Sequence, residues 1–398
     1  MLIKDNLLRK GKLMEAHIVG WGHTPFGRLD ETLEELICSA GREAMEHAQV
    51  DPKDVDGIWI GHANGGLVPD SFISSMPLQI SSDLRFVPTT RLENACASGS
   101  AAVFGARNAI ESGRTKVALV IGVEKMTAKD TKGVTEALMT ASYQAEESKF
   151  SFPHLFGRYA DSYFQANGNK SDILAKIAAK NHSNSVRNPL AQMQKDVGFE
   201  FCNTVSDRNP MVAPPLRLTD CSLISDGSAA LVMVADDASH NFKRSARFRS
   251  SVQVNDFLPM SKRDLLKFEG PAEAFKKAFE EANISVNDLD FAEVHDCFTI
   301  AELLIYEAMG LTKVGQGSRA VLDGTVFSEG STPINLSGGL KAKGHPIGAT
   351  GVSMHALAAA QVVGEAGLMQ KTAANLGCIF NMGGTGVVNY CSILEASR

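Results

Sequence analysis

The sequence has no long apolar run, no metal-binding cysteine pattern and no strong excess of charge. No apolar stretch approaches the roughly 18 residues of a membrane-spanning helix. The seven cysteines, an odd number, include no Cys-x-x-Cys pair and no Cys/His ligand spacing, which argues against a disulfide framework or a zinc site. The net charge of −6 gives no reason to expect a nucleic acid or an anionic membrane as partner. We therefore expect a metal-free protein of a reducing compartment, the cytoplasm.

We expect no targeting signal at either end of the chain. Residues 1–13 are basic but lack the apolar core of a signal peptide, and a strand-like run begins at 16–20. The terminal Glu-Ala-Ser-Arg differs from the peroxisomal Ser-Lys-Leu signal. The fold is expected to begin near Met14, which makes residues 1–13 an extension. The 398 residues, 44% of them hydrophobic, predict a globular protein of two or three domain-sized units.

Reactive chemistry is most expected around one cysteine. A β-rich segment at 86–90 leads into Asn-Ala-Cys-Ala-Ser-Gly at 94–99, and a helix of small residues and a buried strand at 117–122 follow. Cys96 is thus predicted at a strand-to-helix turn, where the helix dipole and free N–H groups favour a thiolate and can bind an oxyanion. A free cysteine is also often just a small buried apolar residue, so this stretch alone leaves both roles open.

The second half of the chain repeats the first. Residues 44–56 and 278–290 align at a constant offset, and Cys-Ala-Ser-Gly at 96–99 then matches Gly-Ala-Thr-Gly at 348–351. Two matches in the same order favour a duplication. Two such halves packed face to face would bring both helix N-termini to one cleft.

From about 124 to 215 the sequence changes character, with a basic helix at 172–187 and a cluster of aromatic residues. We interpret this stretch as an insertion that covers a site, although the aromatic residues could equally form the core of a small subdomain. These residues are Phe150, Phe152, Phe156, Tyr159, Tyr163 and Phe164.

Two segments of the second half are rich in reactive side chains. Glu-Val-His-Asp-Cys-Phe at 293–298 lies at a predicted strand end, where sites of α/β sheets collect. The glycine-rich loop at 338–351 holds His345, Lys341 and Lys343, and its backbone can come close to a ligand. Taken singly, such a histidine is more often an ordinary loop residue, and the two lysines are expected to be solvated.

Three motifs together resemble the thiolase superfamily: the cysteine motif at 94–99, Gly-His-Pro-Ile-Gly-Ala-Thr-Gly at 344–351 and Asn-Met-Gly-Gly-Thr-Gly at 381–386. The resemblance covers nearly the whole chain from about Met14. Within the superfamily, His-Asp-Cys-Phe at 295–298 resembles the mark of the sterol-carrier-protein-type branch. The resemblance implies an α/β thiolase fold, with two duplicated βαβαβαββ halves in a five-layer αβαβα arrangement and an inserted loop domain.

The resemblance also implies domain boundaries. The N-terminal half would comprise 14–123 and 216–245, the loop domain that binds CoA and the acyl group 124–215, and the C-terminal half 246–398.

The implied activity is reversible acyl transfer between acetyl-CoA or another acyl-CoA and a 3-oxoacyl-CoA, through an acyl thioester on Cys96. His345 would take the Cys96 proton, and Cys297 would act as acid and base at the Cα of the acetyl group. His295 and His345 would donate to the enolate oxygen.

Further residues are implied less directly. The N–H of the nucleophile and one near Gly383 or Gly384 would form a second oxyanion hole. Ser222 matches a serine that contacts pantetheine in relatives, and His154 and Phe156 fall near positions that line the acyl pocket there.

The late motif departs from the family pattern. Most thiolases keep their second catalytic cysteine in a Cys-x-Gly motif there. Aligned on the glycines, that position falls on Phe380, and Cys378 lies two residues away, which is about 6–7 Å along an extended chain. The second catalytic cysteine should therefore be Cys297, with Cys378 structural.

Expected partners are acyl-CoA, CoA, a second copy of the chain and an accessory acyl-shuttling subunit, in lipid metabolism. No metal or redox cofactor is implied. The polar, β-prone strand at 88–94 pairs across a two-fold axis in relatives, which implies a homodimer or tetramer. Two alternatives are a Claisen-type C-acyltransferase on a non-CoA acceptor and an acyl-CoA-binding subunit of a larger complex. The complete set of two cysteines and two histidines argues against the first alternative and against an inactive scaffold, but not against an active enzyme inside a complex.

Overall fold

The computed structural model describes residues 14–397, so the predicted extension at 1–13 lies outside the described residues. Their main sheet has the strand order β3-β2-β4-β7-β1-β8-β11-β10-β9. In chain order these strands are β1 (Ala16–His23), β2 (Gly57–Gly61), β3 (Thr89–Leu92), β4 (Val117–Glu124), β7 (Gly227–Ala235), β8 (Ala246–Asn255), β9 (Phe291–Val294), β10 (Leu376–Gly383) and β11 (Val388–Ala396). The two halves of the sheet meet where β1 pairs with β8.

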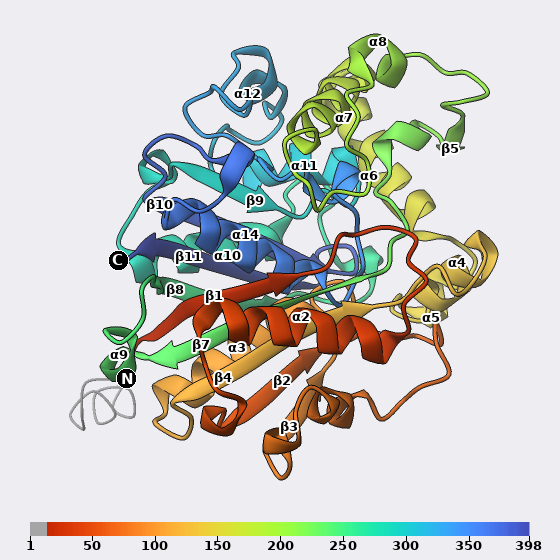
Figure 1. The fold of residues 1–398 in the computed structure, drawn as a ribbon. Helices are drawn as coiled ribbons and strands as arrows, with labels where there is room; N and C mark the ends of the chain where they lie inside the picture. Colours follow the sequence, from red (N-terminus) through yellow and green to blue (C-terminus); the bar gives the residue numbers. More distant parts are fainter. Residues whose placement is uncertain (1–13, 398) are drawn as a thin grey trace.

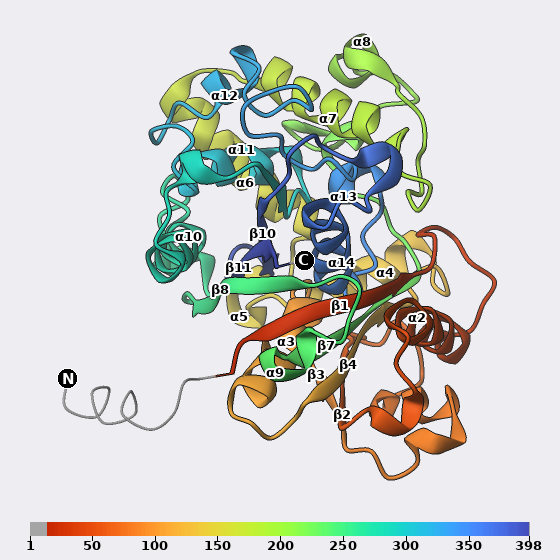
Figure 2. The ribbon, with the colours of Figure 1, turned by 60° about the vertical axis from the view of Figure 1, so that its left-hand side comes forward.

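Four helices divide the molecule into layers. They are α2 (Leu33–Ala48), α3 (Ser98–Glu111), α10 (Glu269–Ala282) and α14 (Thr350–Val362). Helix α2 packs on β1, β4 and β7, and α10 packs on β8 and β11. Helices α3 and α14 contact each other and strands of both halves, so they lie between them (Figures 1 and 2). This gives the predicted αβαβα order, and the predicted fold class is confirmed.

The two halves share one topology. From the centre of the sheet outward, β1-β7-β4-β2-β3 corresponds to β8-β11-β10-β9, and a parallel bridge between Ala292 and Ile334 takes the place of β3. The matched helices also end alike, since Gln49 after α2 and Asn283 after α10 both adopt positive φ, 58° and 51°. The repeat seen in the sequence thus corresponds to equivalent elements.

Four further helices lie outside the insertion between β4 and β7. They are α9 (Asp236–Ser239), α11 (Thr299–Ala308), α12 (Ser318–Leu322) and α13 (Gly339–Ala342). Short 3-10 turns lie at Pro52–Asp54, Ile73–Gln79, Ser82–Leu84, Leu218–Asp220, Met260–Lys262, Val286–Asp288 and Gly367–Met369. No helix within residues 14–397 is both long and apolar enough to cross a membrane.

An insertion separates β4 from β7, at the right and top of Figure 1. It contains α4 (Thr131–Met139), α5 (Gln144–Glu147), α6 (Phe152–Asn167), α7 (Ser171–Ser185), α8 (Gly198–Asn203), β5 (Met211–Ala213) and β6 (Leu216–Arg217). The sequence boundary at 215 divides the β5–β6 hairpin, because the main sheet resumes only at Gly227. Phe152 and Phe156 line a cavity, as the first interpretation expected, whereas Tyr159 and Tyr163 belong to the main core shared with both halves and not to a separate subdomain core.

Helices α3 and α14 meet at their N-terminal ends through glycines. A Cβ atom on Gly99 would lie 2.7 Å from the carbonyl oxygen of Gly348, and one on Gly351 would lie 2.2 Å from the backbone nitrogen of Ser100. The contact is between backbones, so no side-chain rotation could relieve a clash. Glycine at these positions therefore permits the approach that brings the two helix N-termini to one site.

We predict that Gly351→Ala lowers the free energy of unfolding by about 1–3 kcal/mol, the usual cost of overpacking a close contact. Gly27→Ala is the matched control, because the nearest atom to its added Cβ would be Cδ2 of Leu29 at 3.8 Å. Urea unfolding followed by circular dichroism measures both. Equal losses in the two variants would contradict the importance of the helix contact.

Candidate active site

Cys96 lies in the turn between β3 and α3, as predicted. The turn is tight, since Ala95 adopts a positive φ of 49°. The Ser98 hydroxyl secures it by accepting from the Asn94 N–H at 2.9 Å and donating to the Ala95 carbonyl at 2.7 Å. The half-buried cysteine therefore precedes the first turn of the central helix α3.

The four predicted catalytic side chains are brought together from both halves. The rings of His295 and His345 are 5.0 Å apart and nearly perpendicular. One nitrogen of each ring and the Cys96 sulfur all lie within 4.8 Å of one another. Cys297 lines the same cavity as Cys96 and His345, and this cavity has a volume of about 210 Å³.

The hydrogen bonds of His345 define which nitrogen carries its proton. Its Nδ1 lies 2.7 Å from the Thr350 hydroxyl, which donates its own hydrogen to the Pro346 carbonyl at 2.9 Å. The hydroxyl must therefore accept from Nδ1–H, which leaves Nε2 with a lone pair. This Nε2 is buried without a hydrogen-bond partner within residues 14–397. His345 thus presents a base beside Cys96.

His295 has the opposite tautomer. The Asn381 amide nitrogen donates to the Cys96 carbonyl oxygen at 3.2 Å, which fixes its orientation because that oxygen can only accept. The same nitrogen is 2.8 Å from Nδ1 of His295, so Nδ1 accepts and Nε2 carries the proton. The buried Nε2–H has no partner within the described chain. His295 therefore offers a donor where His345 offers an acceptor.

The site holds its groups in their neutral forms. Burial raises the pKa of the Cys96 thiol to about 12, although the backbone N–H groups of Gly384 and of Cys96 act in the opposite direction. Burial lowers the pKa of His345 to about 3, and burial with His345 nearby holds that of His295 well below its usual value. The two N–H groups that favour a negative sulfur are those expected of an oxyanion hole.

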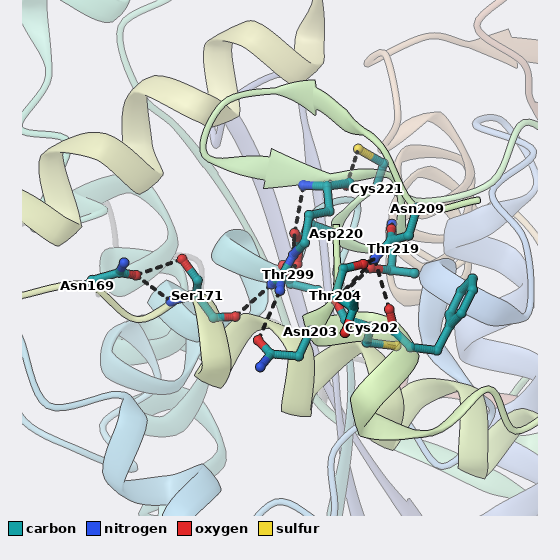
Figure 3. A network of polar contacts seen from close by, with 12 residues as sticks. Asn169, Ser171, Cys202, Asn203, Thr204, Asn209, Thr219, Asp220, Cys221 and Thr299 are labelled. Atoms are coloured by element: carbon teal, nitrogen blue, oxygen red, sulfur yellow. Dashed lines mark hydrogen bonds and ion pairs between the residues drawn. The ribbon is translucent and has the colours of Figure 1, made fainter. Parts of the chain in front are cut away.

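Cys297 follows β9, and a hydrogen bond from the insertion holds its backbone in place. The Ser222 N–H donates to the Cys297 carbonyl at 2.9 Å. The segment before Ser222 is held by Asp220, which accepts from Thr299 at 2.8 Å and from Arg217 Nε at 2.9 Å (Figure 3). Burial raises the pKa of the Cys297 thiol well above its usual value. Cys297 is therefore a fixed, protonated thiol.

Asp296 lies between His295 and Cys297 in the sequence, and its role is structural. Its carboxyl group accepts from the N–H groups of Leu340 and Lys341 at 2.6 and 3.2 Å, and from the Asn181 amide at 2.7 Å. Burial and the nearby Glu302 raise its pKa to about 7. Asp296 thus ties the His-Asp-Cys-Phe turn to the loop that leads to His345.

The expectation that Lys341 and Lys343 are solvated is wrong. Both are buried, and Nζ of Lys343 donates to the Ser353 hydroxyl at 3.1 Å. The cause is that their loop passes beneath the insertion, where the Gln192 N–H donates to the Lys343 carbonyl at 2.9 Å. Burial lowers the pKa of both amines.

Cys378 lies in β10, away from the reactive groups. Its sulfur is 3.7 Å from that of Cys391 on the neighbouring strand. Two residues on, Phe380 stacks on Phe275 of α10 with ring centroids 4.6 Å apart. Asn381, the next residue, faces the site. Because successive side chains of a strand alternate between faces, Phe380 and Cys378 lie on the face turned toward α10.

The predicted substrate-binding residues divide into two groups. Ser222, Phe156 and Gly384 line the cavity with Cys96. His154 is exposed, with its Nδ1 2.7 Å from the Ser151 hydroxyl, and is absent from the cavity lining. Positions two residues apart on a helix point about 200° away from each other. Because Phe156 of α6 faces the cavity, His154 faces away from it. The structure does not bring His154 to the site.

Several supporting residues carry no role in the sequence interpretation. Asn381 and Thr350 set the tautomers of His295 and His345. The Ser225 hydroxyl accepts from the backbone N–H of His345 at 2.9 Å. The buried Glu124 accepts from the Gly348 N–H at 3.1 Å and from the N–H groups of Ala63 and Asn64, in the loop after β2, at 3.0 and 3.1 Å. Asn381 and Thr350 lie in the glycine-rich motifs, and this is the one signal in the sequence that could have identified them.

Two groups within the described residues have the spacing of metal ligands. One is Cys96, His295 and His345; the other is Glu15, His17 and Asp236. The first group would suit Zn²⁺, but its histidine tautomers already fit acid–base chemistry without an ion. The expectation of a metal-free protein stays a prediction.

Comparisons with known proteins give the family. The family "Thiolase, N-terminal domain" matches residues 16–237, and "Thiolase C-terminal domain-like" matches 253–396. The chain belongs to the thiolase family. It is an enzyme of acyl transfer, as the sequence predicted.

Two relatives and one solved structure illustrate the similarity. An acetyl-CoA acetyltransferase of Methanothermobacter thermautotrophicus is 36% identical over 94% of this chain and 97% of its own. Human sterol carrier protein 2 is 31% identical over 94% of this chain and 71% of its own, which agrees with the predicted branch. The structure titled "Ltp2-ChsH2(DUF35) aldolase" covers 96% of this thiolase and 98% of that chain, with a TM-score of 0.83 at 21% identity.

We predict that this thiolase loses stability as the pH falls below about 6.5. Burial lowers the pKa of His23, His182 and His345 to about 3 and that of His355 to about 4. In the unfolded chain these groups take up protons near 6.5, whereas the folded chain resists protonation, so the free energy of unfolding falls between pH 6.5 and 3. Urea unfolding at pH 7.5 and 5 measures this, and His355→Gln should weaken the dependence. Equal stability at both pH values would refute it.

Proposed function

We propose that this thiolase is an acetyl-CoA acetyltransferase that interconverts a 3-oxoacyl-CoA and CoA with acetyl-CoA and an acyl-CoA. The observation that carries the proposal is the pair of opposed histidine tautomers beside Cys96. Nε2 of His345 is a base without a partner in the described chain, and Nε2 of His295 carries a proton. His345 can remove the thiol proton, and His295 can stabilise a developing oxyanion.

In the cleavage direction, His345 takes the Cys96 proton and the thiolate attacks the 3-oxo carbonyl. The N–H groups of Cys96 and Gly384 stabilise the oxyanion. The Cα–Cβ bond breaks, and the electron pair forms an enolate whose oxygen accepts from His295. The Cys297 thiol protonates the enolate carbon, which releases acetyl-CoA and leaves the acyl group on Cys96.

The second half of the reaction restores the protein. The Cys297 thiolate takes the proton of an incoming CoA thiol. The CoA thiolate attacks the thioester on Cys96, and the new acyl-CoA leaves. Cys96 recovers its proton from His345. The raised pKa of the Cys297 thiol supports its role as a proton donor that stays protonated until the enolate forms.

Only CoA and its thioesters are needed as reactants in this scheme, without a metal or redox cofactor. The seven cysteines are all free, which supports a reducing compartment such as the cytoplasm. The exchange of acyl groups between CoA thioesters supports a role in lipid metabolism. An accessory subunit is supported by the solved structure whose title, "Ltp2-ChsH2(DUF35) aldolase", joins two protein names. The same neighbour is compatible with an active enzyme inside a complex, whereas the Claisen-type alternative has no further support.

We predict that the protein cleaves acetoacetyl-CoA in a CoA-dependent assay and that Cys96→Ala abolishes this. Mass spectrometry after incubation with acetyl-CoA should place the acetyl group on the Cys96 peptide. Cys297→Ala should keep this acetylation but lose cleavage by at least about 10²-fold, the scale of an acid–base group. Cys378→Ala is the matched control and should retain both steps. Loss of cleavage in the Cys378 variant, with retention in the Cys297 variant, would contradict the assignment.

We also propose that two copies form a dimer through β3. This strand is an edge of the sheet, so its outer N–H and C=O groups are open to another strand. Exposed aromatic side chains lie beside it, with Phe72 78% and Phe86 84% exposed. Two copies related by a two-fold axis would pair their edges and cover these rings.

Light scattering should report at least twice the chain mass of 42.6 kDa. Phe86→Asp should weaken the dimer by placing charge on its contact surface. Phe257→Asp is the control, because Phe257 is 61% exposed and lies outside β3 and its flanking turns. A monomer at micromolar concentration would rule the proposal out.

A further inference from the structure

The turn between β10 and β11 carries the Gly384 N–H, one of the two groups that favour a negative sulfur on Cys96. The turn comprises residues 384–387, and Gly384 and Gly386 adopt positive φ of 63° and 80°. A glycine has no side chain that could fix its own backbone. The placement of this N–H therefore depends on the contacts that other segments make with the turn.

One end of the turn rests on the backbone that precedes Cys96. A Cβ atom on Gly383 would lie 2.3 Å from the Asn94 carbonyl oxygen, so the two backbones touch there. The Val387 N–H donates to the Gly383 carbonyl at 3.1 Å and closes the hairpin. These contacts set how near the turn comes to Cys96, and they leave its outer part, at Thr385, to be held by other segments.

Two side chains hold Thr385. Arg263, which precedes α10, donates from its two terminal nitrogens to the carbonyl and the hydroxyl of Thr385, both at 2.5 Å. The Tyr159 hydroxyl of α6 donates to the same carbonyl at 3.1 Å. Tyr159 and Thr385 are buried and Arg263 is half-buried, a setting in which a hydrogen bond is stronger than in water. Three hydrogen bonds therefore converge on one residue of the turn.

Arg263 is committed to this turn and not to an ion pair. Within residues 14–397 it has no carboxylate partner, whereas Arg249 of β8 pairs with Glu395 at 3.3 Å. A guanidinium presents its donors as a rigid, flat fork. Two bonds from this fork to Thr385 therefore restrict both the position and the rotation of the turn.

Tyr159 links the turn to the insertion. Its ring stacks on that of Phe156, which lines the cavity with Cys96, and the two centroids are 5.6 Å apart. On another side it meets the edge of the Phe268 ring, with centroids 5.7 Å apart. Phe268 in turn packs on Gly386, where a Cβ atom would lie 2.9 Å from its ring. These rings fix Tyr159, so its hydroxyl has a defined direction.

We infer that Arg263 and Tyr159 are positioning residues, which hold the Gly384 N–H where it stabilises the Cys96 sulfur and the oxyanion of the reaction. The effect on the reaction rests on the proposed function, whereas the effect on the free sulfur does not. Loss of one oxyanion-hole donor costs about 10²–10³ in kcat, and a displacement of about 1 Å can cost about 10². A donor that is loosened but still present should therefore cost about 10–10² in kcat.

The first measurement is the kcat and KM of acetoacetyl-CoA cleavage in Arg263→Met, which removes every donor. The kcat should fall by about 10–10²-fold with KM nearly unchanged, because the lost interaction acts in the transition state. Arg263→Lys restores the charge but not the fork and should recover part of the loss. Tyr159→Phe should lose less, since Arg263 remains. Arg249→Met is the matched control, because Arg249 is also half-buried and donates to the Ala282 carbonyl at 2.8 Å.

The second measurement separates positioning from a general loosening of the fold. Iodoacetamide reacts with a thiolate, so its reaction with the Cys96 peptide at pH 8 reports how well the free sulfur is stabilised. In Arg263→Met this alkylation should be about 3–10-fold slower, because the thiolate fraction changes about tenfold for each pKa unit. A variant that had only loosened would expose Cys96 and would be alkylated faster.

Each outcome decides the question. If Arg263→Met keeps the kcat and the alkylation rate of the unmodified protein, or is alkylated faster, the inference is overturned. The same holds if Arg249→Met loses as much kcat. If Arg263→Met does not fold, Arg263→Lys and Tyr159→Phe undergo both measurements with the same expected directions. If the unmodified protein does not cleave acetoacetyl-CoA, the proposed function fails, and the alkylation rates still test the hold on the Gly384 N–H.

Discussion

The close approach of α3 and α14 is the contact on which the rest of the site depends. The backbones meet at Gly99 and Gly351 without room for a Cβ atom. This brings the N-terminus that follows Cys96 beside the one that follows His345, although the two residues are far apart in the chain. Two helix dipoles then point their positive ends at one place. The candidate site thereby combines residues of both halves of the duplicated fold, and neither half could build it alone.

Burial and fixed hydrogen bonds then give each group its protonation state. A low-polarity setting keeps Cys96, Cys297 and the two histidines neutral, and so the proton positions are set by neighbours. Thr350 accepts from one ring and Asn381 donates to the other. In the proposed reaction, charge arises only when substrate is bound and the Cys96 proton moves to His345. The N–H groups of Cys96 and Gly384 are already placed for the oxyanion, so little reorganisation is needed.

The insertion has two structural duties. Its network around Asp220 anchors the segment that hydrogen-bonds to Cys297 (Figure 3). Its helices α4 and α6 supply Leu138 and Phe152 beside the nucleophile. Changes in the insertion could therefore alter substrate choice without disturbing the central sheet, because the reactive groups themselves belong to the two halves.

Sequence by itself determined the duplication and the position of the four reactive residues at strand or helix ends, since these depend on local patterns, and the resemblance to the thiolase superfamily implied the layered fold. The capping box of Thr32 and Glu35, which starts α2, is equally local. Tertiary structure decided the rest. Only packing beneath the insertion buries Lys341 and Lys343, and only the rotation of α6 separates His154 from Phe156. The roles of Asn381 and Thr350 depend on hydrogen bonds, and that of Asn381 joins residues almost 300 positions apart. Protonation states and cavity walls arise from such contacts, which a linear pattern does not encode.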